Sequence, residues 1–215
     1  MGTLPEIIEE IIRADNAGII TDEQKDDNDF LEALANEYRA QAIFDIYAKT
    51  KRINPAWTQQ MVIDYDPQIQ ESDCYLLFPA PNPISLGPLM DGHIYIGSDC
   101  GAINYPKARS RADLANRNNH RHTRVKIDKP KVLFSDGCYE VYGNMMLRKL
   151  MVDGINSYPT EVPTYNKYID PYPISPDVLI MMKSYVIKET AQPTNTPADT
   201  KSDSQHTTTS INAQK

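Results

Sequence analysis

The chain has 215 residues, of which 40% are hydrophobic, and its formal net charge is -7 at pH 7. This length suits one domain, or one domain with a second unit inserted into it. The negative charge argues against binding nucleic acid by electrostatics alone, and no apolar run approaches the ~20 residues of a membrane-spanning helix. Because the N-terminus also lacks the pattern of a signal peptide, we expect three reduced thiols in a cytoplasm: Cys74, Cys100 and Cys138.

Two amphipathic helices are predicted in the N-terminal unit, residues 1–56. Thr3 and Glu6 have the spacing of a capping box, and apolar residues follow them at helical spacing. A longer helix is predicted over about residues 29–51, where one apolar stripe contains Leu31, Leu34, Ala35, Tyr38, Ala42 and Ile46. The first 50 residues hold 12 acidic and four basic side chains, so this unit is acidic.

Short strands are predicted in the next unit, residues 57–157, because short apolar runs alternate there with turn residues. The runs are residues 61–65, 75–78, 94–96, 123–127, 132–134, 139–142 and 146–151. Asp136 and Gly137 stand between two of them and predict a β-hairpin. The sequence therefore predicts an α+β fold, in which an antiparallel β-sandwich or barrel-like unit is inserted between N- and C-terminal helices that form a small bundle.

The interval over residues 98–122 is long and polar. We expect an exposed excursion from the β unit, with a helical turn near residues 109–115. Between residues 105 and 132 the chain has nine basic and two acidic side chains. The candidate site residues of this basic loop are Lys107, Arg109, Arg111, Arg117, Arg121 and Arg124.

Three interpretations of the basic loop remain open. Arginines in a polar loop contact DNA phosphates without reading the base sequence. The same residues can instead pair with the acidic N-terminal helices of the next copy in an oligomer. We favour this pairing because both charged partners are present in the chain. The third interpretation is a solvated loop that has no partner.

A proline-rich strap and a last helix are predicted for residues 158–190. Pro171, Pro173 and Pro176 restrict the backbone of the strap, and Ser175 can cap a helix that begins at Pro176. This helix presents an apolar stripe, and its candidate assembly residues are Leu179, Met182, Tyr185 and Val186. Residues 191–215 are almost entirely polar, and we expect them to be disordered or to become ordered on a partner.

No catalytic, metal or cofactor site is predicted. The histidines and cysteines lack the spacing of a zinc site, and the glycines lack that of a phosphate-binding loop. One alternative function is a hydrolase that uses His93 with Cys100 or Asp99. Another is a β-sandwich that binds a glycan or a receptor through exposed aromatic side chains. The candidate aromatic residues are Tyr95, Tyr105 and Tyr139.

Two stretches carry a resemblance to a known family: residues 34–41 (LANEYRAQ) and residues 172–183 (YPISPDVLIMMK). Together with the acidic N-terminus and the β insertion, they resemble the ring proteins below the portal of short-tailed crAss-like bacteriophages, which are similar to tail-tubular or head–tail adaptor proteins. The resemblance implies a non-enzymatic virion structural protein of the tail or neck, made in the host cytoplasm. It also implies a homo-oligomeric ring, commonly of twelve copies, which contacts the portal and adjacent tail ring proteins and conducts the genome DNA.

Overall fold

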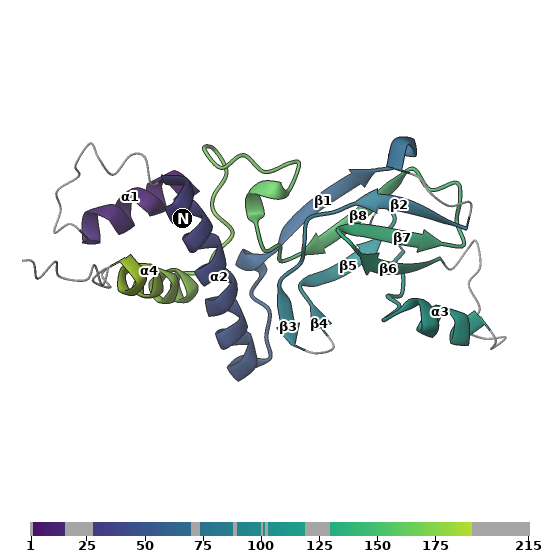
Figure 1. The fold of residues 1–215 in the computed structure, drawn as a ribbon, viewed down its shortest axis with the longest axis horizontal. Helices are drawn as coiled ribbons and strands as arrows, with labels where there is room; N and C mark the ends of the chain where they lie inside the picture. Colours follow the sequence, from purple (N-terminus) through teal and green to yellow (C-terminus); the bar gives the residue numbers. More distant parts are fainter. Residues whose placement is uncertain are drawn as a thin grey trace, which may run out of the picture.

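The computed structural model is elongated, with three helices at one end and the β-sheets towards the other (Figure 1). It describes residues 2–15, 28–69, 74–87, 90–99, 101, 103–118 and 130–190. The helices are α1 (Leu4–Asp15), α2 (Asn28–Thr50), α3 (Arg111–Asn118) and α4 (Pro176–Thr190). The strands are β1 (Gln59–Asp64), β2 (Tyr75–Pro79), β3 (Ser85–Gly87), β4 (Met90–Asp91), β5 (His93–Gly97), β6 (Lys131–Ser135), β7 (Cys138–Tyr142) and β8 (Lys149–Gly154). The described chain is therefore mixed α+β, as the sequence predicts.

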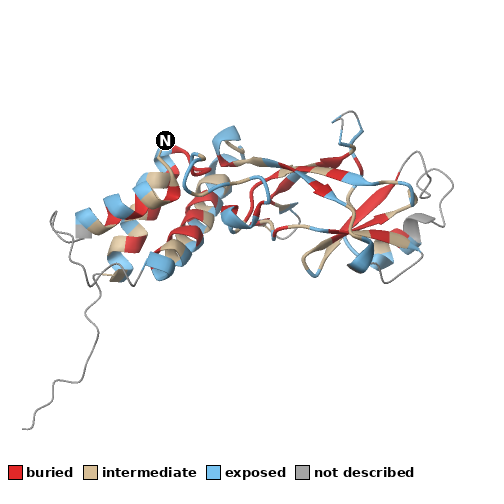
Figure 2. Ribbon diagram, turned by 90° about the horizontal axis from the view of Figure 1, so that it is seen from above, coloured by how far each residue is buried: buried red, intermediate tan, exposed pale blue. Residues whose placement is uncertain are grey.

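Helices α1, α2 and α4 share one hydrophobic core. One of the two hydrogen bonds of the predicted capping box is present at the start of α1, where the backbone N–H of Thr3 donates to Oε2 of Glu6 at 2.9 Å. Helix α4 begins at Pro176, which suits the first helical position because an N–H there would have no partner within the helix. Figure 2 shows buried residues along the helices at this end, and they include Leu4, Ile8, Ile11, Ala42, Ile43, Val178, Met182 and Val186.

The β end contains two three-stranded antiparallel sheets, with strand orders β1-β8-β5 and β2-β7-β6. Strands β3 and β4 form a separate two-stranded ribbon. The predicted hairpin joins β6 to β7, and its turn residues Asp136 and Gly137 have positive φ angles of 51° and 73°. The two larger sheets share a second hydrophobic core, whose buried members include Met61, Phe78, Ile96, Tyr139 and Leu150.

The excursion predicted at residues 98–122 is attached to the β end along its first half, although most of its described residues there are exposed. Asn104 pairs with Gly97 of β5, and Lys107 pairs with a residue of β6. Tyr105 lies between them and is only 4% exposed, so this segment connects the edge strands of the two larger sheets. The exposed excursion is thus confirmed for the described residues, but its attachments are not predicted, because isolated apolar residues in a polar stretch give no periodic signal.

The other predictions for the β region and the C-terminal segment have different outcomes. The helical turn expected near residues 109–115 is confirmed as α3. Strands β3 and β4 are not predicted, since runs of two or three residues are too short for an alternating pattern to be seen. The strand predicted at residues 123–127 and the C-terminal segment 191–215 lie outside the described residues.

Candidate functional site

A buried polar junction joins the helical end of the molecule to its β end. At its centre is Arg39 of α2, whose side chain is completely buried. Its guanidinium donates to three backbone carbonyls: Nε to Pro173 at 2.8 Å, Nη1 to Asn156 at 2.9 Å and Nη2 to Trp57 at 3.2 Å. These acceptors lie in the strap before α4, just after β8 and just before β1. One side chain therefore holds four parts of the chain together.

The charge of Arg39 is stabilised without an acid. Burying a charged group costs free energy unless its donors are satisfied, and no carboxylate forms an ion pair with Arg39 among the described residues. Burial accordingly lowers the pKa of the guanidinium. The ring of Tyr172 lies with its centroid 5.5 Å from Cζ of Arg39 and adds a cation–π contact. Carbonyl oxygens and one aromatic face thus take the place of a carboxylate.

Two further hydrogen bonds fix the strap against the rest of the molecule. The Tyr172 hydroxyl donates to Oδ1 of Asn36 at 2.7 Å, and Nε1 of Trp57 donates to the Ser175 hydroxyl at 2.6 Å. All four side chains are buried. Ser175 stands directly before α4 as predicted, and its hydroxyl donates to a carboxylate in the first turn of that helix. Because the apolar stripe of α2 gives no sign of buried polar residues, sequence reasoning missed both Asn36 and Arg39.

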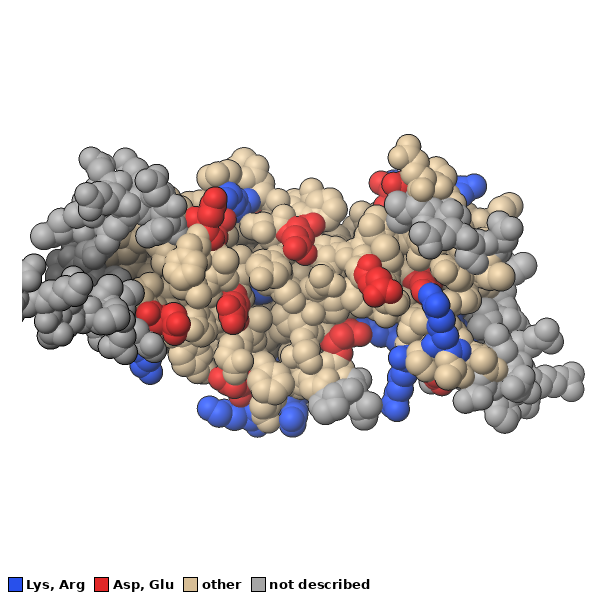
Figure 3. Space-filling view, viewed as in Figure 1, with Lys and Arg blue, Asp and Glu red and all other residues tan. Residues whose placement is uncertain are grey.

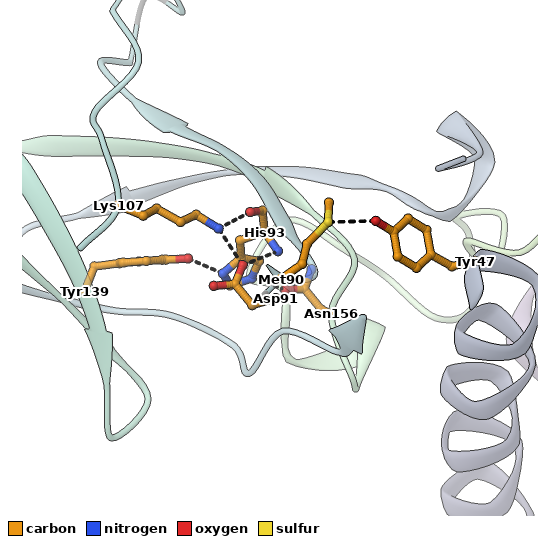
Figure 4. A network of polar contacts seen from close by, with 7 residues as sticks. All are labelled: Tyr47, Met90, Asp91, His93, Lys107, Tyr139 and Asn156. Carbon is orange, nitrogen blue, oxygen red and sulfur yellow. Dashed lines mark hydrogen bonds and ion pairs between the residues drawn. The ribbon is translucent and has the colours of Figure 1, made fainter. Parts of the chain in front are cut away.

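His93, at the start of β5, lies on the β side of the junction (Figure 4). Its Nε2 is 2.9 Å from Oδ1 of Asn156, and its Nδ1 contacts the hydroxyl of Tyr139. An amide oxygen only accepts hydrogen bonds, so Nε2 carries the proton and Nδ1 accepts from Tyr139. Burial lowers the pKa of His93 to about 4, and the ring is therefore neutral at physiological pH. Through Asn156 this ring connects β7 to Arg39.

Two glycines permit the close backbone approach beside His93. A Cβ added at Gly154 would lie 2.6 Å from Cα of His93 and 2.7 Å from the carbonyl oxygen of Gly92. A Cβ added at Gly92 would lie 2.4 Å from the carbonyl oxygen of Ile155. Because backbone atoms cannot yield as the end of a side chain can, a larger residue at Gly154 would push β5 away from β8. The hydrogen bond between His93 and Asn156 would then lengthen.

Lys107 belongs to the predicted basic loop, but the structure attaches it to the junction. Its ammonium donates to the carboxylate of Asp91 and to the backbone carbonyl of His93 (Figure 4). The neighbouring residue of β4, Met90, contacts α2: the Tyr47 hydroxyl lies 2.9 Å from Sδ of Met90. Lys107 is thus half-buried and paired within the chain.

Arg111, another residue of the predicted basic loop, is also paired within the chain. Its Nη2 is 2.6 Å from Oε1 of Glu140, which also accepts a hydrogen bond from the Tyr142 hydroxyl. Glu140 is only 3% exposed, so Arg111 covers a buried carboxylate. The hydrogen bond to Glu140 and the charge of that carboxylate raise the pKa of the Arg111 guanidinium.

The other four residues of the predicted basic loop are only partly described by the structure. Arg109 is exposed, and its side chain forms no ion pair with any residue that the structure describes. Arg117 lies in α3, whereas Arg121 and Arg124 lie outside the described residues. The structure therefore brings Lys107, Arg109 and Arg111 to the α3 side of the β end, and Arg109 is the one of these three that has no ion pair with a described residue.

The candidate assembly residues of α4 face the chain's own core. Met182 and Val186 are completely buried. Leu179 and Tyr185 are half-buried against the same core, and the Tyr185 hydroxyl donates to a carboxylate of α2 at 3.3 Å. This stripe therefore stabilises the helices of one chain. The exposed face of α4 carries Ile180, which is 71% exposed.

The residues of the hydrolase alternative do not form a catalytic arrangement in the described part of the chain. His93 is buried, and both of its ring nitrogens already have partners. Asp99 is exposed and forms no hydrogen bond or ion pair with His93, while Cys100 lies outside the described residues. The low pKa of His93 also removes it from the range that suits a general base at neutral pH.

The aromatic residues of the binding-module alternative are not presented to solvent. Tyr105 and Tyr139 are 4% and 1% exposed. Tyr95 is half-buried, and its hydroxyl donates to the carbonyl of Ile103 at 2.9 Å. These three tyrosines therefore stabilise the β end and do not form an exposed stacking surface.

The chain was compared with protein-family models and with curated proteins. No protein-family model matches the chain, and a search of curated proteins found no similar sequence. Among the described residues, no group of three or more His, Cys, Asp or Glu side chains is placed to hold a metal ion. No helix in that part of the chain is long and apolar enough to cross a membrane.

Proposed function

We propose that this chain is a structural protein of a short-tailed phage virion, in which copies of it form a ring of the portal–neck–tail assembly and surround the path of the genome. Its partners are further copies, the portal and the adjacent tail ring proteins. The resemblance of the sequence provides the class of assembly. One observation supports it most strongly: an acidic excess lies on α1 and α2, and a basic excess lies on residues 103–118 at the other end of the molecule.

The division of charge follows the long axis. Helices α1 and α2 carry eight acidic and three basic side chains. Residues 103–118, which lead into and form α3, carry four basic side chains and one acidic side chain. Figure 3 shows Lys and Arg side chains near α3 and also at the helical end, and Asp and Glu side chains over both halves, so the two ends differ in their balance of charge and not in having one sign alone. Because one end of an elongated molecule cannot neutralise the other, each end is complementary to a different molecule.

Exposed charges remain at both ends after the internal ion pairs are taken into account. Lys183 pairs with Glu10 at the helical end, as Lys107 and Arg111 pair with acids at the β end. Glu37 and Arg109 are exposed and form no ion pair among the described residues. An exposed ion pair contributes only about 0–1 kcal/mol, so one such contact holds little. A ring repeats the contact in every copy, and the small contributions then act together.

The buried polar junction suits a subunit that contacts neighbours at both ends. Arg39 and His93 connect α2, the strap, β5 and β7 through hydrogen bonds that are shielded from water. The helical and β ends are thereby held at a fixed separation. Fixed contact surfaces lower the entropy cost of assembly, because little has to become ordered when the neighbours bind.

The proposal is tested by co-assembly with the portal protein of the same phage. The full-length chain and the portal are mixed at low salt, and the complex is measured by size-exclusion chromatography with light scattering. We expect a complex of whole-number stoichiometry that weakens as salt screens the charged ends. Arg109→Glu should weaken it further, whereas Arg52→Glu makes the same charge change at an exposed site away from α3. A chain that binds neither the portal nor itself at low salt would contradict the proposal.

A further inference from the structure

A short loop after β8 holds two large apolar side chains in solvent. Tyr168 is 69% exposed and Ile169 is 74% exposed. The loop is closed at both ends: the N–H of Asn166 donates to Oδ2 of Asp170 at 2.7 Å, and the N–H of Asp170 donates back to the carbonyl of Asn166 at 2.8 Å. The N–H of Tyr168 donates to Oδ1 of Asn166 at 3.0 Å. We call Tyr168 and Ile169 the apolar projection.

The loop that carries the projection is attached to α2. Nζ of Lys167 lies 2.7 Å and 2.8 Å from the two carboxylate oxygens of Glu32. The side chains of this pair are only 27% and 20% exposed, so water screens the pair less than a surface ion pair. The Lys167 ammonium also lies 5.3 Å from the centroid of the Tyr168 ring. The projection is therefore positioned before any partner arrives, which lowers the entropy cost of using it as a contact.

A groove lies between α2 and β3. Its volume is about 440 Å³, and its apolar lining is provided by Tyr38, Ala40, Phe44 and Ile84. Phe44 is 38% exposed although it is a large apolar residue. Glu37 is exposed and lies at the same groove. The groove thus combines an apolar surface with a negative charge that has no ion pair among the described residues.

The projection and the groove are associated with different faces and different ends of α2. Glu32, which holds the loop, and Gln41, which lines the groove, are about two and a half helical turns apart and so project from opposite faces of α2. In Figure 1 the segment between β8 and α4 runs beside the upper half of α2, whereas β3 and β4 lie beside its lower half. A molecule therefore cannot fill its own groove. Two different surfaces that fit each other give a head-to-tail contact, and such contacts generate rings when the rotation closes.

We propose that Tyr168 and Ile169 of one copy insert into the groove between α2 and β3 of the next copy. Charge favours a second copy as the occupant, because the third N–H of the Lys167 ammonium can approach Glu37 of the neighbour as the apolar side chains enter. This inference rests on the proposed function and specifies its lateral contact. Copies joined in this way lie side by side, so their acidic and basic ends point along the channel towards the stacked rings.

Two matched substitutions test the contact. Ile169→Asp places a charge at the centre of the projection, and Ile180→Asp places one on an equally exposed isoleucine of α4. Native mass spectrometry of the full chain gives the fraction in oligomers, and circular dichroism checks that both variants are folded. We expect Ile169→Asp to reduce association at least tenfold, as loss of a central apolar anchor does in other interfaces, and Ile180→Asp to leave it unchanged. Equal association of the two variants would overturn the proposal.

A zero-length carbodiimide cross-linker tests the same contact directly. The chain is mixed in two isotope-labelled forms, assembled alone or on the portal, and digested for mass spectrometry. A link between Lys167 and Glu32 is expected within one chain and is the internal control, since their atoms are already in contact. A mixed-isotope link between Lys167 and Glu37 is expected only between copies. Links from Lys167 to the portal alone, or a wild-type chain that stays monomeric with and without the portal, would overturn this contact. Co-assembly with the portal in such a case would leave the proposed function standing.

Discussion

The substitution Arg39→Met tests the buried polar junction most sharply, because it keeps much of the apolar stem and removes every donor. Three buried carbonyls then lose their partner, at a cost of about 1–3 kcal/mol each. Removing a buried charge returns part of this cost, because the guanidinium no longer has to be desolvated. We therefore expect a net loss of about 3–5 kcal/mol, which is a large share of the roughly 5–15 kcal/mol that stabilises a domain.

Urea unfolding followed by two probes measures this loss. Far-ultraviolet circular dichroism reports the helices, and fluorescence reports Trp57, which is the single tryptophan of the chain and receives one of the three Arg39 hydrogen bonds. Arg39→Lys should fall between wild type and Arg39→Met, because one ammonium cannot reach three carbonyls that lie in different directions. Arg13→Met is the control, since Arg13 forms only an exposed pair with Glu9 on α1.

The outcome that refutes this reasoning is specific. If Arg39→Met unfolds within about 1 kcal/mol of the wild type, the three carbonyls have other partners, and the guanidinium does not hold the two ends together. If Trp57 fluorescence changes at lower urea than the helical signal, the junction opens before the helices unfold. In that case it is not part of one cooperative unit.

Three further predictions concern the β end. The pKa of His93 is lowered from 6.5 to about 4, so between these pH values the unfolded chain takes up a proton that the folded chain does not. The free energy of unfolding is therefore expected to fall by about 3 kcal/mol from pH 6.5 to pH 4. Urea midpoints measured across this range should lose that contribution in His93→Gln. Gly154→Ala should lower the thermal midpoint, because its Cβ would meet the backbone of β5, and an unchanged midpoint would show that the strands can separate freely. Arg111→Met alone should destabilise the chain more than Arg111→Met combined with Glu140→Gln, because only the single variant leaves a buried carboxylate without its cation. Equal urea midpoints of the two variants would contradict this ion pair.

Local signals in the sequence account for much of the secondary structure. The Thr3–Glu6 capping box, the start of α4 at Pro176 and the β6–β7 hairpin each depend on residues only a few positions apart. Their chemistry is complete within the local chain, so the sequence alone predicts them. Segments without such signals, such as β3 and β4, acquire their structure from neighbours that the sequence does not place beside them.

The junction could not be predicted for a different reason. Arginine and asparagine at helical positions normally face water, and no local pattern distinguishes Arg39 or Asn36 from exposed residues. Their partners lie far along the chain, at the strap and after β8, and become neighbours only when the helical and β ends meet. The same holds for Lys107 and Arg111, whose acidic partners lie outside the basic stretch that contains them. Net charge along the sequence therefore overstates the free charge of this loop.

The copy number of the chain in purified virions tests the central claim most directly. Quantitative peptide mass spectrometry, with isotope-labelled peptides of this chain and of the portal, measures the ratio of the two proteins in the same particles. A ring matched to the portal predicts a copy number equal to that of the portal or in a simple whole-number ratio to it. Absence of the chain from virions that contain the portal would contradict the account.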